Sequence, residues 1–321
     1  MTGEPLITGA TGFAGSHLLD RLRARGRVWA WSHAAGRQAR SDGDQRVRWQ
    51  SADVVDRAAV ERALAAARPS VIYHCAGIAD VGQSWRDPAL ALHVNVIGTH
   101  NLLEAVRTCG LSCPVLVTGS ALVYQPTSRE IHETDPIGPA TIYGVSKLAQ
   151  ELAAAGHEHA VFLTRPFNHA GPRQSTAYVT SAFAEQLARI EAGEAEPVLR
   201  VGNLDSRRDI TDVRDTVRAY EAIVEQGQPH RPYNVCSGRA YRIGDLLEIL
   251  LGLTRVRVRV VVDPDRLRPS DNPTVLGSHD RLARDTGWTP EVPIEQTLSD
   301  LLDFWRSVRA APASPGAAPR A

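Results

Sequence analysis

A glycine-rich turn near the N-terminus constrains the fold of this chain more than any other feature. A short apolar run at residues 5–8 leads directly into Gly9, Gly12 and Gly15, and a helix-like pattern begins near Ser16. Glycines at this spacing let the backbone turn tightly and come close to a pyrophosphate. The start of the helix then offers free N–H groups and the positive end of its dipole. Because a strand precedes the turn and a helix follows it, the pattern predicts a dinucleotide site.

The rest of the first half alternates strand-like and helix-like segments. Apolar runs typical of buried strands lie at residues 28–31, 47–49, 71–75, 115–118 and 161–164. Apolar residues recur at helical spacing at residues 15–25, 57–67, 93–108 and 143–155. This alternation predicts an α/β fold with a Rossmann-type, doubly wound parallel sheet.

The alternation becomes less regular after about residue 166. We expect helices at residues 173–196, 213–226, 243–250 and 294–306, with strands at 197–201, 233–235 and 255–262. The pattern predicts a Rossmann domain from residues 1–166 plus about 211–235. Residues 167–210 plus 236–309 would then form a smaller α/β C-terminal lobe. The Ala- and Pro-rich tail at 310–321 cannot bury apolar surface, so we expect it to be disordered.

Charge and composition exclude several classes of partner. The chain has 321 residues, and 36 Lys and Arg residues balance 36 Asp and Glu residues. Without net charge or a basic run, a nucleic-acid partner is not expected. The apolar runs are too short to cross a bilayer, no signal peptide is visible, and the four cysteines lack metal-ligand spacing. We therefore expect a cytoplasmic protein with no metal site and no membrane partner.

The end of the second strand bears on which dinucleotide is bound. An acid there normally holds the ribose 2′-OH of NAD. Here the strand ends at Ser32, Arg37 and Arg40 lie just beyond, and no carboxylate occurs before Asp42. This pattern suits the 2′-phosphate of NADP, with NAD as the alternative. Either arginine, taken singly, is equally compatible with a solvated loop.

A tyrosine, a lysine and a serine form a candidate catalytic group. Tyr143 and Lys147 stand at i and i+4, on one face of a predicted helix, and Ser120 follows the predicted strand at 115–118. A cation beside a phenol lowers the pKa of the phenol, so that Tyr143 can exchange a proton with a carbonyl or an alcohol near neutral pH. The Ser120 hydroxyl would hydrogen-bond the same oxygen.

With these motifs, the sequence resembles the extended short-chain dehydrogenase/reductase family over about residues 4–306. The glycine turn, the Ser120/Tyr143/Lys147 triad and Asn95, which has a structural role in that family, carry the resemblance. It implies cofactor contacts from Gly9, Thr11, Gly12, Phe13, Ala14, Gly15, Ser32, Arg37, Asp53, Val54, Cys75, Ala76, Gly77, Tyr143 and Lys147. It also implies a homodimer in which the helices at 93–108 and 143–155 form a four-helix bundle across a two-fold axis.

Within the family, the segments 164–172, 201–215, 233–238, 266–271 and 286–290 are similar to those of the GDP-sugar branch. The resemblance implies that the C-terminal lobe binds a GDP-sugar, with contacts from Ser84, Asn168, Val201, Arg208, Arg268 and Asp271. The planar guanidinium of Arg208 suits a diphosphate. A structural ion pair of Arg208 with Asp209 or Asp212 is the alternative.

One position favours a particular reaction within this branch. Dehydratases of the branch need a carboxylate two residues after the catalytic Ser or Thr, and that position holds Leu122. The sequence therefore predicts NADPH-dependent reduction of the C4 ketone of GDP-4-keto-6-deoxy-D-mannose to GDP-D-rhamnose, or to its C4 epimer. A dehydratase with an unrecognised base, another epimerase of nucleotide sugars, dTDP or UDP in place of GDP, and a catalytically inactive NADP(H)-sensing protein stay open.

Overall fold

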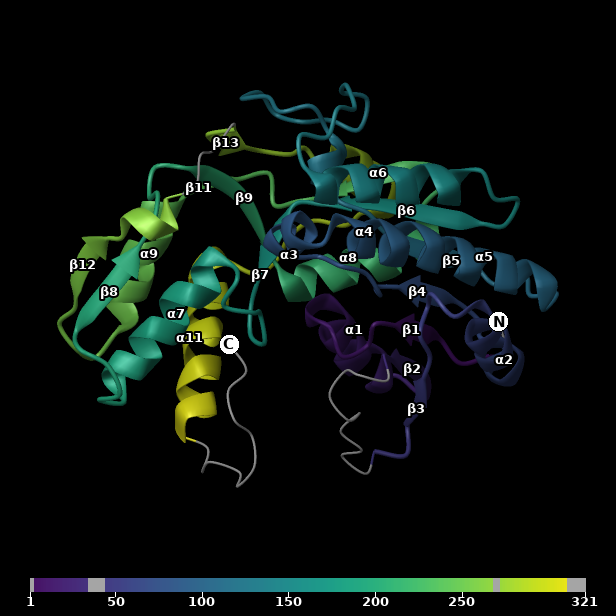
Figure 1. Cartoon of the computed structure of the whole chain (residues 1–321), viewed down its shortest axis with the longest axis horizontal. Helices are drawn as coiled ribbons and strands as arrows, with labels where there is room; N and C mark the ends of the chain where they lie inside the picture. The colour runs from purple at the N-terminus through teal and green to yellow at the C-terminus, as the bar shows by residue number, and fades with distance from the viewer. Residues whose placement is uncertain (1–2, 34–43, 268–271, 311–321) are drawn as a thin grey trace.

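The computed structural model describes residues 3–33, 44–267 and 272–310 (Figure 1). Its larger sheet has seven strands in the order β10-β6-β5-β4-β1-β2-β3, and every neighbouring pair is parallel. The strands are β1 (Leu6–Thr8), β2 (Val28–Ser32), β3 (Val47–Ser51), β4 (Ile72–His74), β5 (Val115–Thr118), β6 (Val161–Pro166) and β10 (Pro232–Val235). The predicted doubly wound parallel sheet is confirmed. Its strand order reverses between β1 and β4, where ligands of such sheets bind.

Helices cover both faces of this sheet because alternate strand residues point to opposite sides. Leu6 packs in a core with α2 (Arg57–Ala67), α5 (Gly98–Thr108) and α6 (Ile142–Ala155). Its neighbour Ile7 packs in a second core with α1 (Phe13–Arg23) and α8 (Val213–Gln226). Both side chains are fully buried. The two cores hold the carboxyl ends of the strands in fixed positions.

A smaller α/β part lies beside the large sheet (Figure 1). Its strands are β7 (Asn168–Ala170), β8 (Val198–Val201), β9 (Arg207–Asp212), β11 (Ala240–Arg242), β12 (Arg259–Val262) and β13 (Thr274–Val275). Its third core includes residues of α7 (Val179–Glu191), α9 (Ile243–Leu253) and α11 (Ile294–Ala310). The boundaries of the two domains expected from the sequence stay a prediction.

The structure changes the bounds of several predicted helices. The helix expected at 173–196 is shorter, because Arg173 and Gly193 have positive φ angles of 74° and 73° that lie outside helical geometry. The segment before α5 continues through α3 (Val81–Arg86), α4 (Pro88–Leu92) and the π-helical turn η1 (His93–Ile97). The last helix continues to Ala310, so the predicted disordered tail begins no earlier than residue 311, outside the described residues.

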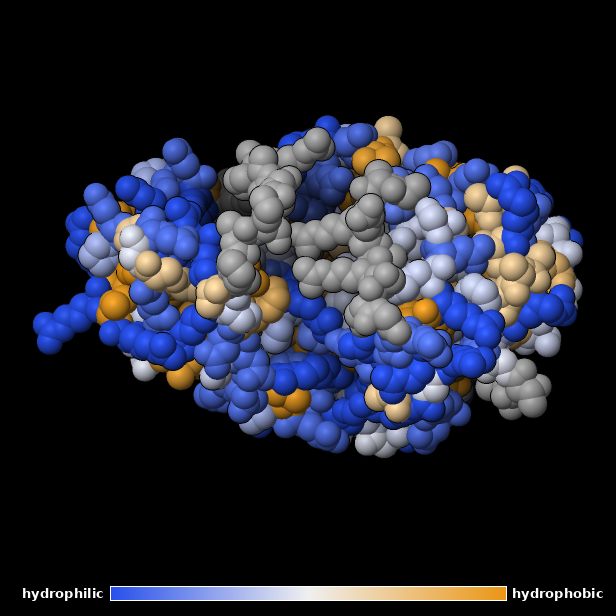
Figure 2. Space-filling view, turned by 90° about the horizontal axis from the view of Figure 1, so that it is seen from below, coloured by the Kyte–Doolittle hydropathy of each residue, from blue (hydrophilic) through white to orange (hydrophobic). Residues whose placement is uncertain are grey.

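The surface gives no indication of a membrane-spanning segment. No helix in the described part of the chain is both long and apolar enough to cross a bilayer. On the face seen from below, the visible residues are mostly hydrophilic, and apolar residues form small separate patches (Figure 2).

A buried ion pair joins α6 to the large sheet. Arg165 on β6 donates to both carboxylate oxygens of Glu151, at 2.9 and 2.5 Å, and both residues are less than one-tenth exposed. Arg165 also donates to the Tyr124 hydroxyl, which in turn donates to the Asn234 side chain on β10. The ion pair and these hydrogen bonds therefore connect α6 with β6 and β10.

Glu151→Ala is expected to lower the free energy of unfolding by about 3–5 kcal/mol, because the guanidinium of Arg165 would stay buried without its counter-charge. Urea unfolding measures the change. Glu61 forms an exposed ion pair with Arg57, so Glu61→Ala is the control and should cost below about 1 kcal/mol. Equal losses in the two variants would contradict the prediction.

Candidate active site

The glycine turn after β1 is closely packed against neighbouring backbone. Gly9 has a φ of +66°, and a Cβ there would lie 2.7 Å from the Ala76 nitrogen. A Cβ at Gly15 would overlap the Gly9 carbonyl oxygen, and the Gly12 N–H donates to that same oxygen at 2.9 Å. Gly12 is the N-cap of α1 and provides no side-chain cap for the helix. The turn is thus a backbone cradle that suits a pyrophosphate.

The remaining residues of the turn face outward or toward the smaller part. Thr11 is exposed, as Gly12 is, and Ala14 is half-buried. Phe13 stacks on the ring of His169 in β7, with 5.5 Å between ring centroids and 6° between ring planes. The cradle is therefore in contact with β7.

β2 and β3 lie on the side of β1 opposite to β4, and residues at their ends were also predicted to contact the cofactor. Ser32 ends β2 and is buried. Asp53 follows β3, where one carboxylate oxygen accepts from the Val55 N–H and the other lies 3.0 Å from His33 Nε2. Val54 is buried against Gly98. The predicted contact Arg37, like Arg40, lies outside the described residues.

The turn after β4 brings the cradle close to the candidate catalytic group. The Ala76 N–H donates to the Thr8 hydroxyl at 3.2 Å. A Cβ at Gly77 would lie 3.4 Å from the ammonium nitrogen of Lys147. Burial raises the pKa of Cys75 to about 12, so its thiol stays protonated. The ends of β1 and β4 therefore meet beside Lys147, at the point where the strand order reverses.

Ser120 hydrogen-bonds Tyr143, Lys147 lies one turn further along α6 than Tyr143, and all three residues are less than one-tenth exposed. Burial raises the pKa of Tyr143, and hydrogen bonding by Ser120 opposes the rise. The prediction that Lys147 lowers this pKa is wrong for the protein alone. The Lys147 ammonium instead donates to the Thr118 carbonyl at 2.8 Å and to the Gln150 side-chain oxygen at 2.9 Å.

The surroundings of Lys147 also shift its own pKa. Burial lowers the pKa of Lys147 to about 8, and interaction with Cys75 raises it slightly against that effect. Lys147 is therefore charged at neutral pH and loses its charge as the pH rises through about 8.

The residues that the resemblance assigns to substrate binding differ in how far they are exposed. Asn168 begins β7 and is exposed. Val201 ends β8 and is fully buried, and its carbonyl accepts from the Asp263 N–H at 2.8 Å, so the predicted contact of Val201 with a ligand does not fit this structure. Ser84 is also buried and donates to the Val81 carbonyl at 2.7 Å, which leaves its hydroxyl only as an acceptor. Arg268 and Asp271 lie outside the described residues.

Arg208 lies on β9, partly buried, and burial lowers its pKa. Its guanidinium donates to the carbonyl oxygens of Arg207 and Pro273. In the described part of the chain, the two carboxylates that the sequence offered as ion-pair partners have other contacts. Asp209 accepts from the backbone of Ser237, Gly238 and Gly277, and Asp212 pairs with Arg214. An ion pair with either of these aspartates is therefore not the role of Arg208.

The structure adds Tyr178, a residue that no motif indicated. Tyr178 precedes α7 in the smaller part, and its hydroxyl donates to the Ala79 carbonyl beyond β4 at 3.2 Å. It is close enough to Tyr143 to raise the pKa of that phenol. No sequence signal could find it, because the contact joins residues 99 positions apart.

Leu122 lies beside Ser120 and is partly exposed. Its side chain is 39% exposed, and its N–H donates to the Ser120 hydroxyl oxygen at 3.1 Å. Within the described residues, the groups that shift the pKa of Tyr143 are the hydroxyls of Ser120 and Tyr178, and neither is a carboxylate. The group can donate a proton to a ketone, but it offers no carboxylate base beside the phenol.

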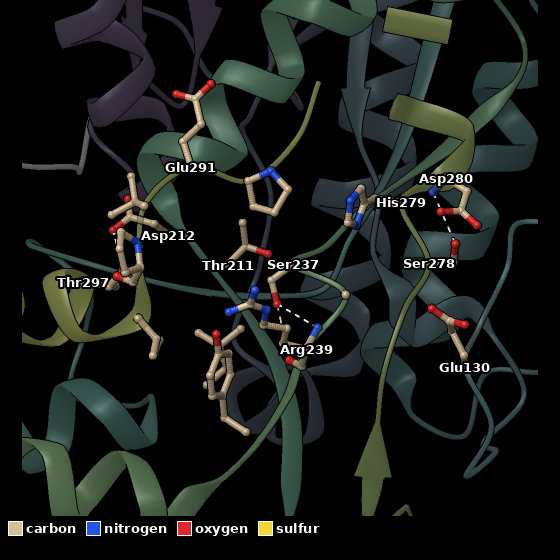
Figure 3. Close-up of a pocket in the computed structure, with 17 residues that line it drawn as sticks. Glu130, Thr211, Asp212, Ser237, Arg239, Ser278, His279, Asp280, Glu291 and Thr297 are labelled. Atoms are coloured by element: carbon tan, nitrogen blue, oxygen red, sulfur yellow. Dashed lines mark hydrogen bonds between the residues drawn. The ribbon is translucent and has the colours of Figure 1, made fainter. Parts of the chain in front are cut away.

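A separate pocket of about 540 Å³ lies between β9 and the starts of α10 (Asp280–Thr286) and α11 (Figure 3). Ser237 and Arg239 line it and are hydrogen-bonded to each other. The Thr211 hydroxyl and His279 Nδ1 are buried there and have no hydrogen-bond partner among the described residues. Ser120, Tyr143 and Lys147 do not line this pocket. The size of the pocket therefore gives no reason to place the reaction in it.

Comparisons with known proteins agree with this geometry. The sequence profile of the GDP-mannose 4,6 dehydratase family matches residues 6–301. The GDP-6-deoxy-D-mannose reductase of Pseudomonas aeruginosa is 35% identical over 318 residues, covering 96% of this chain and 98% of that protein. A GDP-mannose 4,6-dehydratase of Vibrio cholerae is 26% identical and covers 94% of this chain and 93% of its own length.

Solved structures give the same result. The structure of RMD from Pseudomonas aeruginosa complexed with NADPH has a TM-score of 0.82 and 33% identity, covering 95% of this chain and 99% of that one. The UDP-glucose 4-epimerase of Thermotoga maritima, with UDP-glucose, has a TM-score of 0.85 and 26% identity over the same shares of the two chains. The chain therefore belongs to the GDP-mannose 4,6 dehydratase family, in the GDP-sugar branch of the extended short-chain dehydrogenases/reductases.

Proposed function

We propose that this protein is an NADPH-dependent reductase that converts the C4 ketone of GDP-4-keto-6-deoxy-D-mannose to the alcohol of GDP-D-rhamnose. One observation carries the proposal: a buried phenol, hydroxyl and ammonium lie together, while Leu122 replaces the carboxylate that a dehydratase needs. The 35% identity to a GDP-6-deoxy-D-mannose reductase over 96% of the chain supports the same reaction.

The cofactor proposal rests on the fit of the cradle. Gly9 and Gly15 leave no room for a Cβ because the turn packs against its own backbone and that of Ala76. This packing fixes the exposed Thr11 and Gly12 at the start of α1, where a pyrophosphate would bind. Ser32 ends β2 where an NAD site would place an acid, which favours NADP. RMD is complexed with NADPH, whereas the Thermus thermophilus UDP-glucose 4-epimerase, 28% identical, is complexed with NAD. We therefore assign NADPH as the preferred cofactor and keep NAD as the alternative.

The residues of the chain supply the proton and orient the ketone. Tyr143 donates its proton to the ketone oxygen, and its raised pKa keeps that proton in place until the reaction. The Ser120 oxygen accepts from the Leu122 N–H. Its hydroxyl, which hydrogen-bonds Tyr143 in the free protein, would turn to the same ketone oxygen when the substrate binds. Lys147 uses two of its three N–H groups within the protein and keeps one for a ligand. NADPH, when bound, supplies the hydride to C4.

We assign the GDP moiety to the smaller part of the molecule, with the domain boundaries predicted from the sequence. Arg208 supplies a planar guanidinium suited to the diphosphate, and Asn168 supplies an exposed amide. Ser84 can accept one hydrogen bond, whereas Val201 is fully buried and we assign it no contact. Arg268 and Asp271 complete the proposed set.

We also propose that the protein is a cytoplasmic homodimer. Exposed apolar side chains gather on the helices that the resemblance places in a four-helix bundle and on the segment just before them: Trp85, Leu90, Leu92, Ile97, Val145 and Leu152. Of these, Leu152 on α6 is 65% exposed. Exposed apolar residues on several neighbouring helices favour an interface with another protein.

The function is tested by mixing the protein with NADPH and enzymatically prepared GDP-4-keto-6-deoxy-D-mannose. We expect NADPH oxidation and formation of GDP-D-rhamnose, identified by NMR. A 6-deoxytalose product would overturn the assigned stereochemistry at C4. Conversion of GDP-mannose without net NADPH oxidation would instead show a dehydratase. NADPH binding without turnover of any nucleotide sugar would show a sensing protein.

Gly15→Ala tests the proposed cradle. The added methyl would overlap the Gly9 carbonyl, so we expect the affinity for NADPH to fall by at least about tenfold. Titration of NADPH fluorescence measures the change. A Cβ at Gly26 would have no other group within 4 Å, so Gly26→Ala is the matched control. Unchanged affinity in Gly15→Ala would place the pyrophosphate elsewhere.

The lowered pKa of Lys147 predicts a pH dependence. The value of kcat/KM for NADPH reports ionisations of the free enzyme. Because Lys147 loses its charge as the pH rises through about 8, kcat/KM should fall above that pH, while Tyr143 with its raised pKa stays protonated. Lys147→Arg keeps its charge, so its lower activity should show no such decline. A flat wild-type profile up to about pH 9.5 would contradict the prediction.

Leu152→Glu should convert the dimer to a monomer, because it places a charge in the proposed apolar interface. Light scattering measures the mass at micromolar concentration. Leu253→Glu, at a 37% exposed position on α9 away from the bundle, is the control and should stay dimeric. A wild-type protein of monomer mass would refute the interface.

A further inference from the structure

A series of buried, hydrogen-bonded side chains connects Lys147 with Thr8 at the end of β1. The Lys147 ammonium donates to Gln150 Oε1 at 2.9 Å, and Gln150 Nε2 donates to the Thr99 hydroxyl oxygen at 2.8 Å. His74 Nε2 lies 2.9 Å from the same Thr99 oxygen, and His74 Nδ1 lies 2.7 Å from the Thr8 hydroxyl. Lys147 is 4% exposed and the other four residues are fully buried.

The donors and acceptors of this chain fit only one arrangement of protons. The Thr99 hydroxyl donates to the Asn95 carbonyl at 2.7 Å, so its proton is already used. His74 must therefore carry its proton on Nε2 and donate to the Thr99 oxygen. His74 Nδ1 then accepts from the Thr8 hydroxyl, whose oxygen accepts from the Ala76 N–H. The ring is a neutral connector with a fixed tautomer.

Burial supports the neutral ring. It lowers the pKa of His74 to about 3, and the nearby Lys147 acts in the same direction. A ring that stays neutral over the working pH range does not carry protons between solvent and the active site. The chain therefore acts through geometry and local polarity.

The chain connects Lys147 to the cofactor cradle. Thr8 is the last residue of β1 and immediately precedes Gly9, while His74 is the last residue of β4 and precedes Cys75. Lys147 also donates to the carbonyl of Thr118, the last residue of β5. The ammonium is thus held against the ends of three adjacent strands.

We propose that Gln150 is a positioning residue for the reduction: its amide holds the Lys147 ammonium and, through Thr99 and His74, fixes it relative to the turn at Gly9. The assignment rests on the proposed function, because it gives Lys147 a role in binding NADPH. Gln150 touches neither the reacting atoms nor solvent, so it acts through Lys147 alone.

The other groups around Lys147 leave its charge sensitive to Gln150. From β4 and the following turn it is faced by neutral His74 and the Cys75 thiol. On its own helix, Tyr143 lies one turn away and shows no effect on the pKa of Lys147. Glu151, the next residue after Gln150, is engaged by Arg165. Among the described residues, the groups that shift the pKa of Lys147 include no carboxylate. A charge introduced at position 150 would therefore act directly on the ammonium.

Two variants of similar size test the proposal in opposite directions. Gln150→Glu places a carboxylate beside the ammonium, so the decline in NADPH affinity at alkaline pH should move upward by about one unit or more. Gln150→Leu removes an acceptor from the charged form, so the decline should move downward and kcat should fall. Gln296→Glu, exposed on α11, is the control for added charge and should leave the profile unchanged.

The main readout is the dissociation constant of NADPH against pH, measured by fluorescence without a sugar substrate. If the wild-type protein binds NADPH but reduces no ketone, the proposed function fails while this test stays valid. Shifts in the same direction in both variants, or shifts below about 0.2 unit, would overturn the role of Gln150. Circular dichroism and thermal unfolding confirm folding, and Thr99→Val provides a second break in the chain if Gln150→Leu does not fold.

Discussion

The contact between the turn at Gly9 and the turn after β4 is the constraint on which the rest of the site depends. It exists because Gly9 has no side chain and adopts a φ of +66° that other residues rarely adopt. The contact brings together the ends of the two strands that flank the reversal of strand order. Thr8 and His74 then continue inward from those ends to Lys147. Cofactor cradle and catalytic lysine are therefore parts of one packed unit.

Features that depend on local pattern could be predicted from the sequence. The strand, glycines and helix around Gly9 were predicted, and so was the shared face of Tyr143 and Lys147, because each follows from spacing along one segment. The helix at 213–226 has the predicted bounds for the same reason. The length of α7 could not be predicted, since the residues before it make contacts with distant segments, as in the ion pair of Arg173 with Asp20 and the hydrogen bond of Tyr178 to Ala79. The predicted shift in the pKa of Tyr143 had the wrong direction, because burial, which raises this pKa, depends on the tertiary structure.

The segment 201–215 shows why a family resemblance does not assign each residue a role. Asp209, Asp212 and Asp215 are all nearly fully buried. Asp209 accepts backbone N–H groups of two other segments, and Asp215 accepts those of Glu291 and Val292. These carboxylates hold β9 and α8 against the loops of the smaller part. Arg208 therefore lies in a segment whose buried aspartates serve the fold.

Shared fold explains little about which reaction occurs, because reductases, dehydratases and epimerases are built on this architecture. The Thermotoga maritima UDP-glucose 4-epimerase matches the chain with a TM-score of 0.85. The choice of chemistry must therefore lie in a few side chains around the phenol. In the proposed reductase, leucine at position 122 offers no carboxylate to abstract a proton from carbon, while its N–H still donates to the Ser120 oxygen. The residue at this one position would thus restrict the site to reduction without disturbing the group that donates the proton.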